Sequence, residues 1–137
     1  MRFAPAALSL LLAACAGSPP ETPRAVAASM PEPLTLAATG WTVPGAANPS
    51  AAARLEFSAA GRVTGYTGCN MLTGSYTYDG DRLEVAAATT KRACIGAGSE
   101  TEALMLAILA GRPRVAITGN KLILTTPEGK RLELDRN

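Results

Sequence analysis

The 137-residue sequence contains no histidine. Without an imidazole, the Ser-His-Asp and Cys-His arrangements of nucleophilic catalysis are excluded, and so is the commonest metal ligand. Aromatic residues make up only 4% of the chain and the net charge is +2, with no interleaving of basic and aromatic residues as in nucleic-acid-binding proteins. The acidic residues are scattered and form no evident acid–base pair. We therefore expect no catalytic residue, no cofactor, no metal site and no nucleic-acid partner.

Cysteine is also scarce, and the first of the three cysteines, Cys15, has a distinctive position. It follows Arg2 and an uncharged segment from Phe3 to Ala14, which suits a secretion signal and is too short to span a bilayer. The end of this segment, Leu12-Ala13-Ala14-Cys15, resembles the lipobox that the lipoprotein signal peptidase cleaves. The sequence predicts a signal peptide over residues 1–14 and lipidation of Cys15, since two or three acyl chains make a stable anchor.

Residues 15–33 are rich in proline and alanine and carry little apolar bulk, which is typical of an extended tether. In Gram-negative lipoproteins, an aspartate directly after the lipidated cysteine retains the protein in the inner membrane. Ala16 occupies that position here. We therefore expect a protein of the cell envelope that faces the periplasm, contacts the outer membrane through its lipid anchor on Cys15 and meets an envelope protein as partner.

The remaining residues, 34–137, have the length of one small domain. Short alternating segments separated by turn residues predict about eight strands. Asp79-Gly80 separates two of them and favours a tight hairpin, because glycine tolerates a positive φ. The expected strands are 34–43, 54–57, 62–67, 74–78, 82–85, 114–118, 121–124 and 131–134.

One helix is expected among these strands. Ser99 and Glu102 fit a capping box, and Gly111 followed by Pro113 predicts the end of the helix after Ala110. The run from Leu104 to Leu109 is entirely apolar, so we expect a helix that is hydrophobic nearly all round and largely buried. The predicted fold class is α+β, mainly antiparallel β: a small β-barrel or half-barrel of about eight strands packed on one buried helix.

Three glycines, Gly65, Gly68 and Gly74, fall within ten residues of the central part of the domain. A strand this rich in glycine is expected to bulge or to let another backbone approach closely. Asn70, inside this segment, is suited to close a turn with its side-chain amide. The candidate structural residues of this motif and of the segments that follow are Gly65, Gly68, Asn70, Gly74, Tyr76 and Thr90.

This pattern of glycines, Asn70, Tyr76 and Thr90, together with Cys69 and Cys94, resembles the META domain family of HslJ-like heat-inducible lipoproteins. The resemblance extends from Trp41 to Leu134 and departs from the family at Arg92, where an apolar methionine is common. It implies a small antiparallel barrel or half-barrel with one helix. It also implies an association with heat shock, antibiotic resistance and envelope phenotypes, and implies no enzymatic chemistry.

Cys69 and Cys94 have three possible states. In an oxidising periplasm, two cysteines most often form a disulfide. Free thiols are a second possibility, and a redox pair is a third, although the two residues are 25 positions apart and form no Cys-x-x-Cys arrangement. We favour the structural disulfide, which would fix the start of the helix to the glycine-rich segment.

Three functions remain open from the sequence. The leading hypothesis is a non-enzymatic, membrane-anchored module that supports envelope integrity or the response to heat and antibiotics through protein contacts. The alternatives are a periplasmic inhibitor or ligand-binding barrel, similar to lysozyme inhibitors, and a thiol redox protein. Tyr66, Tyr76 and Tyr78 could line a ligand site, but packing across neighbouring strands is the more common role of such tyrosines.

Overall fold

The computed structural model describes residues 35–137. The predicted signal peptide, the lipidation at Cys15 and the tether of residues 15–33 lie outside the described residues. Within residues 35–137, α1 is the one α-helix, and no helix has the length and apolarity needed to cross a membrane.

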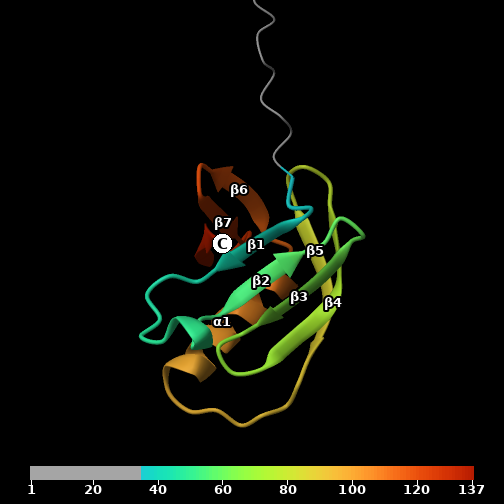
Figure 1. Ribbon diagram of the computed structural model, residues 1–137. Coiled ribbons are helices and arrows are strands. Elements are labelled where there is room, and N and C mark those ends of the chain that lie inside the picture. The colour runs from blue at the N-terminus through green and yellow to red at the C-terminus, as the bar shows by residue number, and fades with distance from the viewer. Residues whose placement is uncertain (1–34) are drawn as a thin grey trace, which may run out of the picture. The chain divides into compact units, whose positions relative to one another are not determined.

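The eight strands form one antiparallel sheet in the order β5-β4-β3-β2-β1-β8-β7-β6. The sheet curls into a half-barrel with α1 packed against it (Figure 1), so the predicted α+β fold class is confirmed. The strands are β1 (Thr39–Thr42), β2 (Arg54–Phe57), β3 (Arg62–Tyr66), β4 (Met71–Tyr78), β5 (Leu83–Thr89), β6 (Arg114–Thr118), β7 (Lys121–Thr125) and β8 (Arg131–Arg136).

The first strand begins later than its alternation predicts. Residues 34–43 were expected to be one strand, but β1 starts at Thr39. Ala38, just before it, has a left-handed φ of 58°, and the Thr39 hydroxyl donates a hydrogen bond to the carbonyl of Leu36. This turn directs the fully buried Leu36 into the core before the strand begins.

The hairpin of β4 and β5 is longer at its open end than expected. Its register runs from Tyr78↔Leu83 next to the turn to Leu72↔Thr89 at the far end. Gly80 in the turn has a φ of 99°, as the Asp-Gly pair predicts, and the Asp79 carboxylate accepts hydrogen bonds from the backbone N–H groups of Asp81 and Arg82. The uncharged Ala86-Ala87-Ala88 segment carries no alternation signal, which is why its pairing was not predicted.

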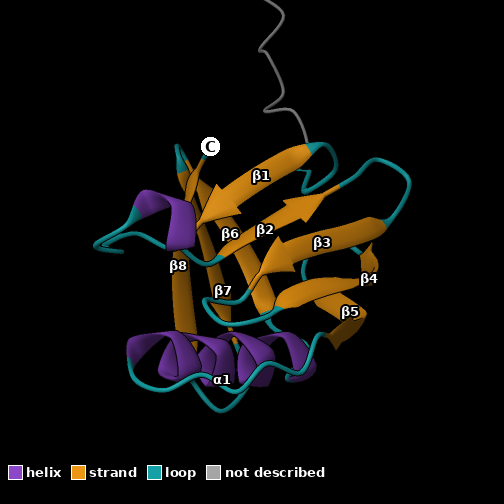
Figure 2. Ribbon diagram, turned by 60° about the horizontal axis from the view of Figure 1, so that its bottom comes forward, coloured by secondary structure: helices purple, strands orange, loops and turns teal. Residues whose placement is uncertain are grey.

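The helix α1 (Ala97–Ala110) lies across one end of the curled sheet (Figure 2) and contacts β5 and β8. It ends where predicted, but the predicted capping box is wrong. Gly96 is the N-cap and the helix starts three residues before the expected first helical residue, so Ser99 lies inside the helix. The carboxylate of Glu102 accepts hydrogen bonds from the β3–β4 turn instead of capping the helix.

The expectation that α1 is largely buried holds for one face of the helix only. Met105, Ile108 and Leu109 are buried, whereas Leu104 is 40% exposed. Because the run is uniformly apolar, its sequence does not distinguish the core-facing side, and packing against the sheet alone selects it. The expected role of Leu104 as a core residue is therefore corrected.

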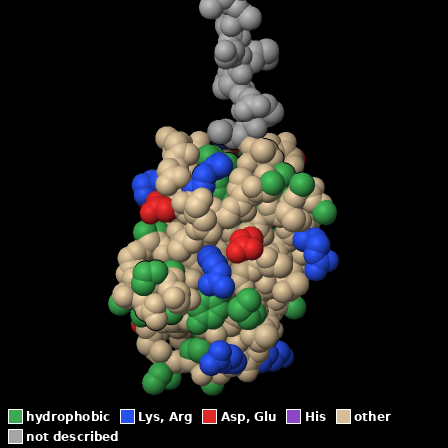
Figure 3. Space-filling view, viewed as in Figure 1, with side chains coloured by type: hydrophobic (Ala, Val, Ile, Leu, Met, Phe, Trp, Pro, Cys, Tyr) green, Lys and Arg blue, Asp and Glu red, His purple; other side chains and the backbone are tan. Residues whose placement is uncertain are grey.

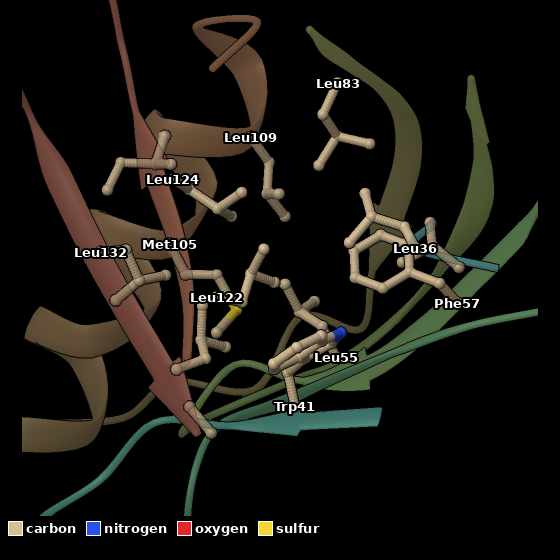
Figure 4. Close-up of a cluster of buried hydrophobic side chains, with 14 of the residues drawn as sticks. Leu36, Trp41, Leu55, Phe57, Leu83, Met105, Leu109, Leu122, Leu124 and Leu132 are labelled. Atoms are coloured by element: carbon tan, nitrogen blue, oxygen red, sulfur yellow. The ribbon is translucent and has the colours of Figure 1, made fainter. Parts of the chain in front are cut away.

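The core lies between the concave face of the sheet and α1. Figure 4 shows Trp41, Leu55 and Phe57 from the first strands facing Met105 and Leu109 of the helix. Alternate residues of every strand supply this cluster, as the period of two dictates. Among the described residues, the largest fully buried side chains are Trp41, Phe57, Leu36, Leu55, Leu72, Leu83, Met105, Ile108, Leu122, Leu124, Leu134 and Val63.

The residue after the helix is a glycine because a neighbouring side chain leaves no room for a Cβ, and not because the backbone needs a left-handed φ. Gly111 has an ordinary φ of −80°, and the left-handed φ of 50° belongs to Arg112, the next residue. A Cβ on Gly111 would lie 2.8 Å from Cγ2 of Thr126. The close packing of the helix end on the loop after β7 therefore requires glycine here.

Candidate functional site

The glycine-rich segment brings neighbouring backbones into close contact. A Cβ on Gly65 would lie 2.2 Å from the Arg54 carbonyl oxygen, and one on Gly74 would lie 2.2 Å from that of Ala86. Both glycines therefore allow the strand beside them to approach, as their number suggested. Gly68 has a φ of 97° and lies against Gly98 at the start of α1. A Cβ on Gly98 would lie 2.5 Å from the carbonyl oxygen of Gly68.

The side chain of Asn70 is the centre of a buried polar cluster and is itself only 3% exposed. Its Oδ1 accepts hydrogen bonds from the Thr90 hydroxyl at 2.8 Å and from the Arg92 N–H at 2.7 Å. Its Nδ2 donates to the Arg92 carbonyl at 3.2 Å and to Oε1 of Glu102 at 3.0 Å. One amide thus connects the β3–β4 turn to the segment after β5 and to the helix.

Glu102 is a hydrogen-bond partner of Asn70 that the sequence did not reveal. It lies 32 residues beyond Asn70, and its other carboxylate oxygen accepts a hydrogen bond from the fully buried Thr67 hydroxyl. That hydroxyl in turn accepts from the Asn70 N–H at 2.9 Å. The spacing of Ser99 and Glu102 predicted a capping box. No local sequence pattern indicated that Glu102 would bind Thr67 and Asn70, which are distant in the sequence.

A disulfide joins Cys69 and Cys94 next to this cluster. The Cα atoms are 5.9 Å apart, within the range that disulfide geometry requires. Cys69 is 3% exposed, so a reductant reaches its sulfur only if the segment opens. Closing a loop of this size stabilises a fold by roughly 3 kcal/mol in the chain-entropy model.

Together these contacts fix residues 90–94, a segment without regular structure, at three successive points. Thr90 and Arg92 are held through Asn70, and Cys94 through the disulfide. Arg92 departs from the family's apolar residue, and here its side chain is exposed while its backbone groups are bound. We call residues 90–96 the pinned loop. Ile95 in this loop is 97% exposed.

The three tyrosines have packing roles. Each hydroxyl donates to a backbone carbonyl: Tyr66 to Gly68, Tyr76 to Ser58 and Tyr78 to Gly80. The Tyr76 ring packs edge-on against Phe57 with centroids 5.0 Å apart. Burial raises the pKa of both Tyr76 and Tyr78, and the carboxylates of Asp79 and Asp81 add to the effect at Tyr78.

Of the eight predicted motif and cysteine positions within residues 35–137, the structure brings Gly68, Cys69, Asn70, Thr90 and Cys94 together around the β3–β4 turn, whereas Gly65 and Gly74 lie against neighbouring strands and Tyr76 packs against Phe57. On the surface seen in Figure 3, acidic and basic side chains are dispersed among polar and apolar ones. The predicted positions are Gly65, Gly68, Cys69, Asn70, Gly74, Tyr76, Thr90 and Cys94, while Cys15 lies outside the described residues.

Fold and site together define a small antiparallel half-barrel domain whose glycine-rich turn is tied to a loop and a helix by one asparagine and one disulfide. The chain belongs to the META domain family, which it matches over residues 34–137.

The fold is similar to two proteins solved by NMR. One, from Burkholderia xenovorans, is 24% identical with a TM-score of 0.62, and the match covers 88% of this chain and 98% of that one. The other is 20% identical with a TM-score of 0.61, covering 77% of this chain and 95% of that one. These likenesses concern the fold alone. No curated protein matches the chain significantly.

Proposed function

We propose that this protein is a membrane-anchored envelope lipoprotein whose META domain acts without chemistry of its own, by holding a loop with an exposed isoleucine for another envelope protein. The lipobox ending in Cys15 supports the anchor, and the family supports the non-enzymatic domain. The stress under which the contact matters is proposed to be heat or antibiotic challenge, on the family resemblance.

The single observation that carries this proposal is the pinned loop with Ile95 on it. An exposed isoleucine on a freely moving loop would lose conformational entropy on binding, which opposes affinity. Here Asn70 and the disulfide already fix the preceding residues. Met71 lies in β4 close to the loop, since its carbonyl accepts the Thr90 N–H, and it is 50% exposed. The loop therefore offers a prearranged apolar contact for a protein partner.

Two experiments test the two halves of the proposal. For the anchor, the intact mass of protein purified from membranes is expected to begin at Cys15 and to include acyl chains. The Cys15→Ser protein is expected to remain an unprocessed precursor or to leave the membrane. An unacylated wild-type protein that starts at another residue would exclude the anchor.

For the contact, a photocrosslinking amino acid is placed at Ile95 in intact cells, with Thr77 on the exposed outer side of β4 as the matched position. We expect a specific adduct from Ile95 and none from Thr77. The adduct should also disappear in Asn70→Ala cells, where the loop is released. A muramidase in the adduct would favour the inhibitor alternative, and equal labelling at both positions would refute the loop as the contact.

A further inference from the structure

The two ends of the curled sheet meet at a pair of arginines. β5 and β6 are the first and last strands in the sheet order, and Arg82↔Arg114 is the bridge between them. Two backbone hydrogen bonds flank this bridge, Leu83 N–H to Pro113 and Val115 N–H to Asp81. Like charges directly opposite each other across an antiparallel pair are destabilising. The seam of the half-barrel therefore places two guanidinium groups where their repulsion must be offset.

Only one carboxylate among the described residues serves both guanidiniums. Oδ2 of Asp81 lies 3.6 Å from Nε of Arg114 and 3.9 Å from Nε of Arg82, too far for hydrogen bonds to either. Arg82 donates one hydrogen bond, to the Arg112 carbonyl. The side chain of Arg114 makes no hydrogen bond to another described residue, so most of the donors at this seam remain available to a ligand.

The seam also has room and further donors. An open hollow of about 490 Å³ is lined by Arg82, Arg114, Thr125 at the end of β7, and the loop that follows β7. Thr125 is the direct cross-strand neighbour of Arg114, and Arg131 is the neighbour of Thr125 on the other side. The outer surface thus carries three arginines and a threonine in one row across four strands. Arg131 is paired with Glu133, whereas the two seam arginines share the single carboxylate of Asp81.

From this arrangement we propose that the β5–β6 seam is a binding site for a phosphate group, held between the guanidiniums of Arg82 and Arg114 with Thr125 beside them. A phosphate has several acceptor oxygens and more than one negative charge, so it can accept hydrogen bonds from two guanidiniums at once. A single carboxylate such as Asp81 neutralises only one of the two cations. The site is distinct from the pinned loop and does not depend on the function proposed for that loop.

The source of the phosphate is either a lipid headgroup or a soluble phosphate compound, and two probes separate them. The full chain is titrated with inorganic phosphate while the guanidinium Nε–H signals are followed by NMR. In parallel, its sedimentation with phosphatidylcholine vesicles is measured as phosphatidylglycerol is added. Binding of the soluble probe alone assigns the site to soluble phosphates, and binding that rises with phosphatidylglycerol assigns it to a membrane surface.

Substitutions at the seam test whether its arginines bind the phosphate probes. Arg82→Gln combined with Arg114→Gln is expected to weaken binding of the responsive probe by roughly tenfold to a hundredfold, the cost of losing hydrogen bonds to a charged group. The charge-matched control, Arg54→Gln with Arg62→Gln on β2 and β3, should reduce binding far less. Asp81→Asn should tighten binding, because the competing carboxylate is removed. Equal binding by the two arginine double variants, weaker binding by Asp81→Asn, or no response to either probe would overturn the proposal.

Discussion

The Asn70→Ala substitution tests whether one buried amide holds the motif together. The change removes five hydrogen bonds, with the Thr90 hydroxyl, the Arg92 N–H, the Arg92 carbonyl, the Glu102 carboxylate and, more weakly, the Cys69 sulfur. Each is worth about 1 kcal/mol net, and the one to a charged group about 1.5 to 3. Thr90 and Arg92 are exposed and regain water after the substitution, so the sum is reduced. We expect a loss of about 2 to 4 kcal/mol in the free energy of unfolding.

The assay is urea unfolding of the oxidised protein at neutral pH, with Asn120→Ala as control. Asn120 lies exposed in the β6–β7 turn, and its substitution should change the free energy of unfolding by less than about 0.5 kcal/mol. A loss below about 1 kcal/mol for Asn70→Ala would refute the reasoning, because it falls under the value of a single buried polar contact.

A second substitution at the same site, Asn70→Asp, should make the stability of the domain depend on pH. Asn70→Asp replaces the Nδ2 donor with an oxygen 3.0 Å from Oε1 of Glu102, so two carboxylates would face each other. We expect a loss at neutral pH at least as large as that of Asn70→Ala. The difference from wild type should narrow as pH falls through the raised pKa of the carboxyl pair, above the ordinary carboxyl value of about 4, because a proton shared by the two carboxyls restores a donor. A difference that does not change with pH would contradict this geometry.

Three further predictions concern the rest of the domain. Ile108→Ala in the buried face of α1 should cost about 2 to 5 kcal/mol in urea unfolding, whereas Leu104→Ala, 40% exposed, should cost less than about 1, and equal losses would contradict the assigned face. Gly74→Ala should cost about 1 to 3 kcal/mol or more because a Cβ meets the β5 backbone, with the exposed Ser75→Ala as a nearly neutral control. The backbone N–H groups of Arg82 and Asp81 lower the pKa of Asp79, so its stabilisation is present above about pH 4 and is lost as pH falls through the folded pKa. In Asp79→Asn, the free energy of unfolding should fall less steeply between pH 5 and pH 2 than in the wild type. An unchanged dependence of this free energy on pH would exclude a contribution from Asp79.

The sequence alone determined those features that depend on neighbouring residues. The bounds of β2 and β6 agree with their predicted residues, because alternation with a period of two is a local pattern. The turn at Gly80 was predicted from its residue pair. The number of glycines predicted either a bulge or a close backbone approach, and the structure shows the close approach at positions 65 and 74.

Tertiary structure decided the features that join residues distant in the chain. The buried face of α1 was one of them, because a uniformly apolar helix has no polar residues that mark its solvent side. The role of Glu102 was another, since its hydrogen-bond partners at Thr67 and Asn70 are more than thirty residues away. The arginine pair at the seam follows from closure of the sheet, which brings strands 25 or more residues apart into register. A hydrogen bond or an ion pair depends on distance in space, and only the folded chain sets that distance.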